Sequence, residues 1–155
     1  MKKYINLYIA AIGIAAFLIG CGSQNEHLSK GKELIKSDKR RKEERAVEQF
    51  KLAIQQESNN AEAHYLLGYY DSKMFYADDD SETGNLAGEN ASIEERGKHM
   101  FLAYQNDKRK YLEILVFETL RNRLLDVQNT ALDALKRIYQ QGDRQKLLKA
   151  LKKAI

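Results

Sequence analysis

The chain has 155 residues, a length that predicts one domain or two small units. Its formal net charge is +4, of which Lys2 and Lys3 contribute two, so the chain from residue 21 onward carries +2. This near-neutral balance argues against a nucleic-acid-binding protein. The sequence contains no proline, which favours helices throughout. It contains one cysteine, which excludes an intramolecular disulfide and a cysteine-rich zinc site.

The first 20 residues, MKKYINLYIAAIGIAAFLIG, have the order of a secretory leader. Two lysines precede a mostly apolar run from Tyr4 to Ile19, and the small residue Gly20 follows it. The alternative is an uncleaved transmembrane anchor. The run is at the short limit for that role, because the hydrocarbon core of a bilayer needs about 20 apolar residues.

The leader ends in Leu18-Ile19-Gly20-Cys21, and this ending resembles the signal of bacterial lipoproteins. The resemblance implies that residues 1–20 are a signal peptide that is removed. It also implies that Cys21 is acylated and becomes the N-terminus, which makes the membrane a partner through the lipid on Cys21. A thiolate is a suitable nucleophile for accepting an acyl-bearing group. Gly22 follows the cysteine instead of aspartate, which is similar to lipoproteins sent to the outer membrane, facing the periplasm, in a host with two membranes.

Residues 21–26 form a polar tether, and residues 27–76 carry helical patterns. Apolar or small residues recur there at spacings of three and four: Leu28, Gly31, Leu34 and Ile35, then Ala46, Val47, Phe50, Ala53 and Ile54. A further helix is expected to start near Asn59 and to include Tyr65, Tyr69 and Tyr70. The charged run between the first two helices, SDKRRKEE, is interpreted as a solvated turn and helix start.

Part of this region resembles the tetratricopeptide (TPR) repeat family. The matching positions are Ala46, Phe50, Ala53, residues 59–63, Leu67 and Gly68, and their spacings fit the 34-residue period. The resemblance implies paired helices that approach closely at the alanines and at Gly68. Ser58 stands where the family usually has proline, and His64 where it has a large residue, so the resemblance covers one clear repeat and a partial second.

Residues 77–91 interrupt the helical pattern with an acidic, glycine-containing stretch, which is interpreted as a flexible loop. Asp78, Asp80 and Glu82 alternate, as oxygen ligands of a calcium ion can. The glycine and the closing glutamate of an EF-hand are not at the required spacing. A solvated loop is therefore favoured over a calcium site, and no metal ligand is assigned.

Residues 92–155 return to helical spacing. Ser92 and Glu95 form the pattern of a capping box at a helix start. A helical face carries Ile93, Gly97, Met100, Phe101 and Tyr104. A helix is expected from Lys110 to Leu125, with Tyr111, Ile114, Leu115, Glu118 and Leu120 distributed around it. The next helix has one stripe of Val127, Ala131, Leu132, Leu135 and Ile138, and the last contains Leu147, Leu148, Leu151 and Ile155. Gly142-Asp143 is expected to end one helix and to cap the last.

Residues 110–141 resemble the HEAT family of helical repeats. The match rests on these positions: Leu124 or Leu125, Asp126, Val127, Ala131, Leu132, Leu135 and Ile138. The resemblance implies that Asp126 caps the second helix of a pair, although Gln128 replaces the arginine usual after the valine. Together the resemblances imply an all-α fold, a short right-handed helical-repeat array (α-solenoid) after a cleaved signal peptide.

Catalysis is not expected from this sequence. His27, His64 and His99 are far apart along the chain. His64 lies in a repeat helix and is interpreted as a partly buried core histidine, and His99 has no carboxylate or cysteine at metal-ligand spacing. No nucleophile turn, phosphate-binding loop or His-Glu-x-x-His motif occurs. We therefore predict no enzyme activity, no cofactor and no small-molecule substrate.

Four tyrosines, Tyr65, Tyr69, Tyr70 and Tyr76, gather along one helix and its exit. Packing between helices explains most such clusters, and a groove for a partner peptide is the alternative, because tyrosine combines a large contact area with a polar tip. The last helix carries Lys146, Lys149, Lys152 and Lys153 opposite its apolar residues. A solvated face is favoured there over contact with anionic lipid or an acidic partner.

These observations predict a lipoprotein of the bacterial cell envelope that acts as a protein-binding scaffold or adaptor through its helical repeats. The alternatives are a ligand- or cation-binding envelope lipoprotein and an accessory subunit of an envelope enzyme. No feature of the sequence selects the partner.

Overall fold

The computed structural model describes residues 25–37, 41–74 and 92–155. These residues form α-helices and no strand, so the prediction of an all-α fold is confirmed for them. The helices are α2 Glu26–Lys36, α3 Lys42–Gln56, α4 Ala61–Met74, α5 Ile93–Asn106, α6 Lys108–Arg121, α7 Leu125–Gln140 and α8 Arg144–Ala154.

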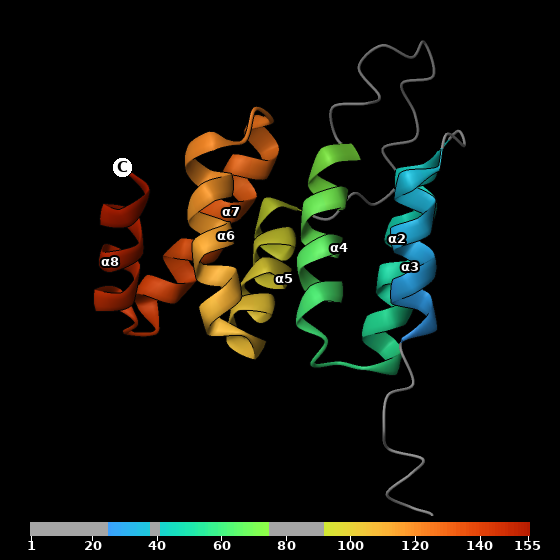
Figure 1. Ribbon diagram of the computed structural model, residues 1–155, viewed down its shortest axis with the longest axis horizontal. Coiled ribbons are helices and arrows are strands. Elements are labelled where there is room, and N and C mark those ends of the chain that lie inside the picture. The colour runs from blue at the N-terminus through green and yellow to red at the C-terminus, as the bar shows by residue number, and fades with distance from the viewer. Residues whose placement is uncertain (1–24, 38–40, 75–91) are drawn as a thin grey trace, which may run out of the picture.

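The helices pack largely in chain order. α2 packs on α3, α3 on α4, and α4 on α5, while α5, α6 and α7 contact one another and α8 lies against α6 and α7. Figure 1 shows α2, α4 and α6 nearer the viewer, with α3, α5 and α7 behind them. The result is a row of helix pairs that is one pair deep and extends along the longest axis of the molecule.

Two hydrophobic clusters hold the row together. The first is built on Ala46, Val47, Phe50 and Leu67, with Leu28, Leu34 and Ile35 packed against it. The predicted inward faces of α2 and α3 are therefore confirmed. Gly31 allows the close contact, because a Cβ placed on it would lie 2.5 Å from Cε1 of Phe50.

The second cluster lies among α5, α6, α7 and α8. Its fully buried side chains include Met100, Tyr104, Tyr111, Leu115, Val127 and Ile138. The predicted stripe of α7 is confirmed except at Leu132, which is 41% exposed. Tyr65 and Tyr69 of α4 also pack against this cluster, so α4 belongs to both halves of the row.

Close approach between α4 and α5 depends on Gly68. A Cβ at this position would lie 2.9 Å from the carbonyl oxygen of Arg96 and 2.9 Å from Cγ of Met100. Because the first of these atoms belongs to the backbone of α5, the two helices would have to separate to admit a larger residue. The interpretation of Gly68 as a packing glycine is confirmed.

Several helix ends agree with their predicted signals, and others differ. The Ser92 hydroxyl accepts from the Glu95 N–H, and the Glu95 carboxylate accepts from the Ser92 N–H, which confirms the capping box. α6 starts at Lys108, earlier than expected, because the Asp107 carboxylate accepts from the Lys110 N–H. It ends at Arg121, and α7 starts at Leu125.

One predicted cap is wrong, and the other is confirmed in its position only. Leu124 holds the cap position of α7, so Asp126 lies within the first turn, and its Oδ2 has no hydrogen-bond partner among the described residues. Asp143 does hold the cap position of α8, and Gly142 precedes it with a φ of +96°. The Asp143 side chain makes no cap bond, because it accepts instead from Tyr104, Lys108 and Lys146.

Candidate functional site

The tyrosines of α4 form part of a continuous aromatic row that crosses three helices. Tyr65 and Tyr69 lie one turn apart with ring centroids 5.9 Å from each other, and Tyr69 meets Tyr70 edge-on at 5.1 Å. Tyr65 reaches Tyr111 of α6 at 5.4 Å, and Tyr70 reaches Phe50 of α3 at 6.1 Å. We call these five residues, Phe50, Tyr65, Tyr69, Tyr70 and Tyr111, the aromatic row.

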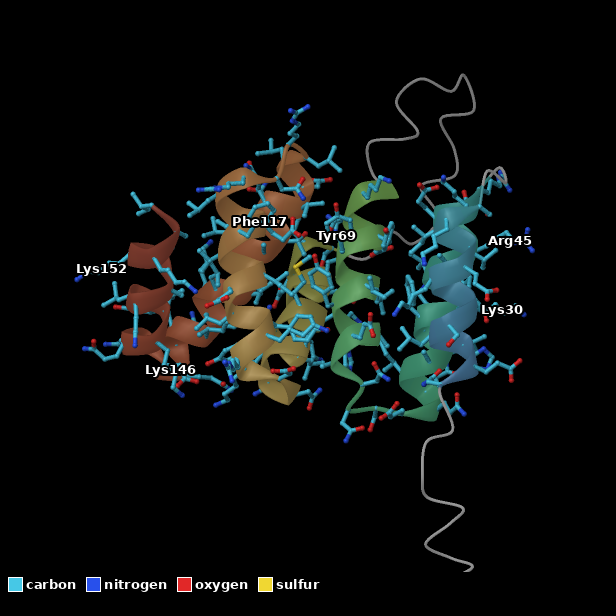
Figure 2. All side chains as sticks on the ribbon, viewed as in Figure 1. Lys30, Arg45, Tyr69, Phe117, Lys146 and Lys152 are labelled. Carbon is cyan, nitrogen blue, oxygen red and sulfur yellow. The ribbon has the colours of Figure 1, made fainter. Side chains whose placement is uncertain are left out.

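Neighbouring tyrosines on α4 pack against different hydrophobic clusters. Tyr65 and Tyr69 pack against the cluster of α5–α8, while Tyr70 packs against the cluster of α2 and α3. Figure 2 shows Tyr69 on the side of α4 that faces α6. The three α4 tyrosines are half-buried, so each gives part of its ring to the core and leaves part at the surface.

A buried carboxylate holds the aromatic row at Tyr65, between Tyr69 and Tyr111. The Tyr65 hydroxyl donates to Oε1 of Glu118 across 2.8 Å, and the Asn122 amide donates to the other carboxylate oxygen. Glu118 is only 7% exposed, so these donors stabilise a carboxylate that is largely removed from water. Burial, with the Glu118 contact, raises the pKa of Tyr65 and keeps its phenol protonated.

Two lysines lie over the surface side of the row. Lys110 Nζ is 4.9 Å from the ring centre of Tyr111, and Lys73 Nζ is 5.7 Å from that of Tyr70. Cations at this distance are attracted by the ring faces. The row therefore presents aromatic surface with cations beside it, and it has no arrangement of acid, base and nucleophile.

The structure brings together two histidines that the sequence interpretation treated separately. Nδ1 of His64 lies 2.9 Å from Nδ1 of His99, and Nε2 of His64 lies 3.0 Å from the carbonyl oxygen of Ser58. The carbonyl can only accept, so Nε2 of His64 carries the proton. In neutral His64, Nδ1 then accepts from Nδ1–H of His99.

This hydrogen-bonded pair requires a neutral His64. Burial lowers the pKa of His64, and burial together with His64 and Lys98 lowers the pKa of His99 to about 4. The sequence signal for the pair was weak, because the two residues are 35 positions apart and on different helices. The prediction that His64 is a core histidine agrees with its exposure of 3%.

Other predicted positions lie outside the described residues. They are the lipid-attachment residue Cys21, the fourth tyrosine Tyr76, and the acidic residues Asp78, Asp80 and Glu82. Within the described ranges, no group of three His, Cys, Asp or Glu side chains is placed to hold a metal ion. No helix in those same ranges is long and apolar enough to cross a membrane.

The fold and the aromatic row define a class only coarsely, as an all-helical protein with a partly exposed aromatic surface. Comparison with protein-family models, curated proteins and solved structures finds no match to this chain.

Proposed function

We propose that this protein is a lipid-anchored adaptor of the bacterial cell envelope that binds another protein through the aromatic row. The anchor is proposed at Cys21, on the basis of the basic and apolar leader that precedes it. The binding role is carried by one observation. Tyr65, Tyr69 and Tyr70 are fixed in the packed structure while part of each ring remains at the surface.

Fixed aromatic side chains suit protein recognition for a thermodynamic reason. Binding costs entropy for every flexible side chain that becomes ordered, and tyrosine has few rotatable bonds for its contact area. Here ring packing and the bond from Tyr65 to Glu118 restrict the row before any partner arrives. A partner would then gain contact area at little ordering cost.

The arrangement of the helices supports the same role. Paired helices in a row one pair deep are the architecture of an α-solenoid, and we propose that the chain is a short array of this kind. Solenoids commonly bind a peptide along the face formed by one helix of each pair. The aromatic row lies where α4 and α6, two such helices, are joined by long side chains.

A photo-crosslinking experiment tests the binding role. A photoreactive phenylalanine analogue at position 69 is compared with the same analogue at position 139, because Tyr139 is also a surface tyrosine, 48% exposed, but lies outside the row. The expected result is one discrete crosslinked species in envelope preparations from position 69 only. Tyr69→Ser, with its helical content checked by circular dichroism to show that it remains folded, should remove the uncrosslinked complex. Equal crosslinking at both positions would contradict the proposal.

The anchor is tested separately by labelling cells with a palmitate analogue. The full chain should incorporate the label, and Cys21→Ala should not. Incorporation that persists in Cys21→Ala would exclude this residue as the lipid-attachment site. The anchor and the binding role are tested independently, because Tyr69 and Cys21 are changed in different variants.

A further inference from the structure

A second surface lies at the C-terminal end of the row of helices, where α8 lies against α6. The two helices border a groove of about 240 Å³ whose floor and walls are mainly apolar. The lining residues are Glu113, Val116, Phe117, Leu120, Arg121, Ala150, Lys153 and Ala154. We call this the α6–α8 groove.

Two large apolar side chains in the groove are exposed well beyond what packing requires. Phe117 is 54% exposed and Leu120 is 44% exposed, and they lie close to one turn apart on α6. Small residues, Ala150 and Ala154, stand across from them on α8. The shape is that of a slot between two helices, into which an apolar side chain from outside can insert.

Two exposed polar contacts span the slot. Lys153 Nζ pairs with Oε1 of Glu113 at 2.8 Å, and the Arg121 guanidinium donates to the carbonyl oxygen of Ala154 at 3.2 Å. Both contacts tie α8 to α6. The groove is thus already open in the absence of any partner, which reduces the cost of filling it.

The charge around the groove is strongly positive. Residues 108–155 contain 12 lysines and arginines against 5 aspartates and glutamates, a net charge of +7. α8 itself contains Arg144, Lys146, Lys149, Lys152 and Lys153 and no acidic residue. The neighbouring carboxylate of Asp143 is already paired with Lys108 and Lys146, and its contacts with Tyr104 and these lysines lower its pKa.

Some of these cations have no acidic partner. Lys149 and Lys152 form no ion pair with any described residue, and Figure 2 shows Lys152 directed away from α6 at the edge of the molecule. A partner that covers the groove would meet apolar side chains in the middle, and it would lie within the positive field of α8, whose Lys149 and Lys152 stand outside the groove lining. Such a surface selects an acidic partner.

We propose that the α6–α8 groove binds an acidic amphipathic helix, which inserts apolar side chains between Phe117, Leu120 and α8. The concave form favours a helix over a flat lipid surface, because a bilayer surface cannot enter a slot between two helices. The lining runs from Glu113 to Arg121 on α6 and from Ala150 to Ala154 on α8, so the groove accommodates roughly two turns of a partner helix. This surface is separate from the aromatic row, and the proposal does not depend on the proposed function.

The test begins with a displayed library of random 12-residue peptides selected on the full chain in neutral detergent. The selected peptides are expected to be acidic, with apolar residues three or four apart. Their affinities are measured by fluorescence anisotropy. Phe117→Asp should weaken binding at least tenfold, whereas Leu132→Asp, an equally drastic change at an exposed apolar position on α7, should leave it unchanged.

Charge is tested with a matched pair of double variants. Lys149→Glu with Lys152→Glu should weaken the same peptides about tenfold, and the effect should shrink at high salt. Lys30→Glu with Lys36→Glu changes net charge equally on α2, and it should have little effect. Equal losses in both double variants would show a general charge effect and overturn the proposal.

Nuclear magnetic resonance mapping decides between occupants. Amide signals of Phe117, Leu120 and Ala150 should shift on addition of a selected peptide. Selection of neutral or basic peptides, or of no peptide, would overturn the proposal. Signal shifts confined to the aromatic row would also overturn it, and they would support the proposed function instead. Shifts in the groove with anionic bicelles alone would assign the surface to lipid, and concentration-dependent self-association lost in Phe117→Asp would assign it to a second copy; either result overturns the proposal.

Discussion

The histidine pair shows how one buried contact makes the stability of the fold depend on pH. His64 and His99 connect α4 to α5 as neutral rings. Glu95 is the acidic group that favours protonation of His99, and Lys98 and Lys51 are the cations that oppose it. Burial and the cations have the larger effect, so the pKa of His99 in the folded chain lies at about 4, below its ordinary value of 6.5.

The sign of the effect follows directly. Below pH 6.5 the unfolded chain binds a proton at His99, whereas the folded chain binds this proton only near pH 4. The free energy of unfolding therefore falls as the pH falls through this window. At pH 4.5 the loss from this residue approaches about 2 kcal/mol. We expect His99→Gln, which retains an N–H donor toward His64, to lose less unfolding free energy between pH 7 and pH 4.5 than the unmodified chain.

Urea denaturation at the two pH values measures that difference. Carboxylates also titrate in this range, but they are common to both chains and cancel in the comparison. His27→Gln is the matched control, because the His27 ring lies on α2 and contacts Gln49, far along the chain from the pair. An identical pH dependence in His99→Gln and the unmodified chain would show that folding does not lower the pKa of His99.

Gly68 offers a second prediction at the level of one residue. Alanine has the higher helix propensity by about 1 kcal/mol, so Gly68→Ala would stabilise an isolated helix. In this chain the new methyl group would collide with the α5 backbone at Arg96 and with Met100. We expect a net destabilisation of about 1–3 kcal/mol by thermal or chemical denaturation. Lys98→Ala, at an exposed position on α5, should change stability by less than about 0.5 kcal/mol.

At the scale of helices, local signals are reliable where the residues that satisfy them are close in sequence. The capping box of α5 needs only Ser92 and Glu95, and both of its hydrogen bonds form. We expect Ser92→Ala to cost about 0.5–2 kcal/mol of unfolding free energy. Gln55→Ala, on the exposed side of α3, should be nearly neutral, and an equal effect of the two changes would contradict a capping role for Ser92.

The same signals fail where a distant residue competes for the side chain. Asp143 stands at the start of α8, as a cap would, yet Tyr104 of α5 and Lys108 of α6 donate to its Oδ2, and Lys146 of α8 donates to its Oδ1. Leu132 has the spacing of a core residue, but it lies outside the buried face of α7, which is formed by Val127, Thr130, Ala131, Ala134, Leu135 and Ile138. Periodicity therefore predicts which helices form and most of each buried face.

Sites assembled from several helices were less accessible to sequence reasoning. Tyr65, Tyr69 and Tyr70 were identifiable because they share one helix. Tyr111 of the row, and Glu118, which accepts from the Tyr65 hydroxyl, lie more than 40 positions further along. The helical pattern includes both residues but does not place them beside α4. The same separation concealed the contact of His64 with His99. Such contacts depend on the order in which helices pack, and that order is a property of the whole chain.

Across the whole molecule, α4 is the element that connects the two hydrophobic clusters. Tyr70 and Leu67 belong to the cluster with Phe50, whereas Tyr69 and Tyr65 pack against the cluster of α5–α8. The Ser72 hydroxyl, fully buried, also lies 2.8 Å from that of Thr130 on α7. In a row of helices that contact mainly their neighbours, stability is distributed along the row, and one end can open before the other.

Removal of the Phe50 ring from the first cluster should therefore destabilise the helices near it more than those far from it. Phe50→Ala should cost about 3–5 kcal/mol locally, because the ring is fully buried between α2 and α3. Amide hydrogen exchange should accelerate most in α2 and α3, less in α4, and least in α6 and α7. Ile138→Ala, at a fully buried position of the second cluster, should reverse this order. If either variant accelerates exchange equally in every helix, the row unfolds as one cooperative unit, and α4 couples the clusters more strongly than it separates them.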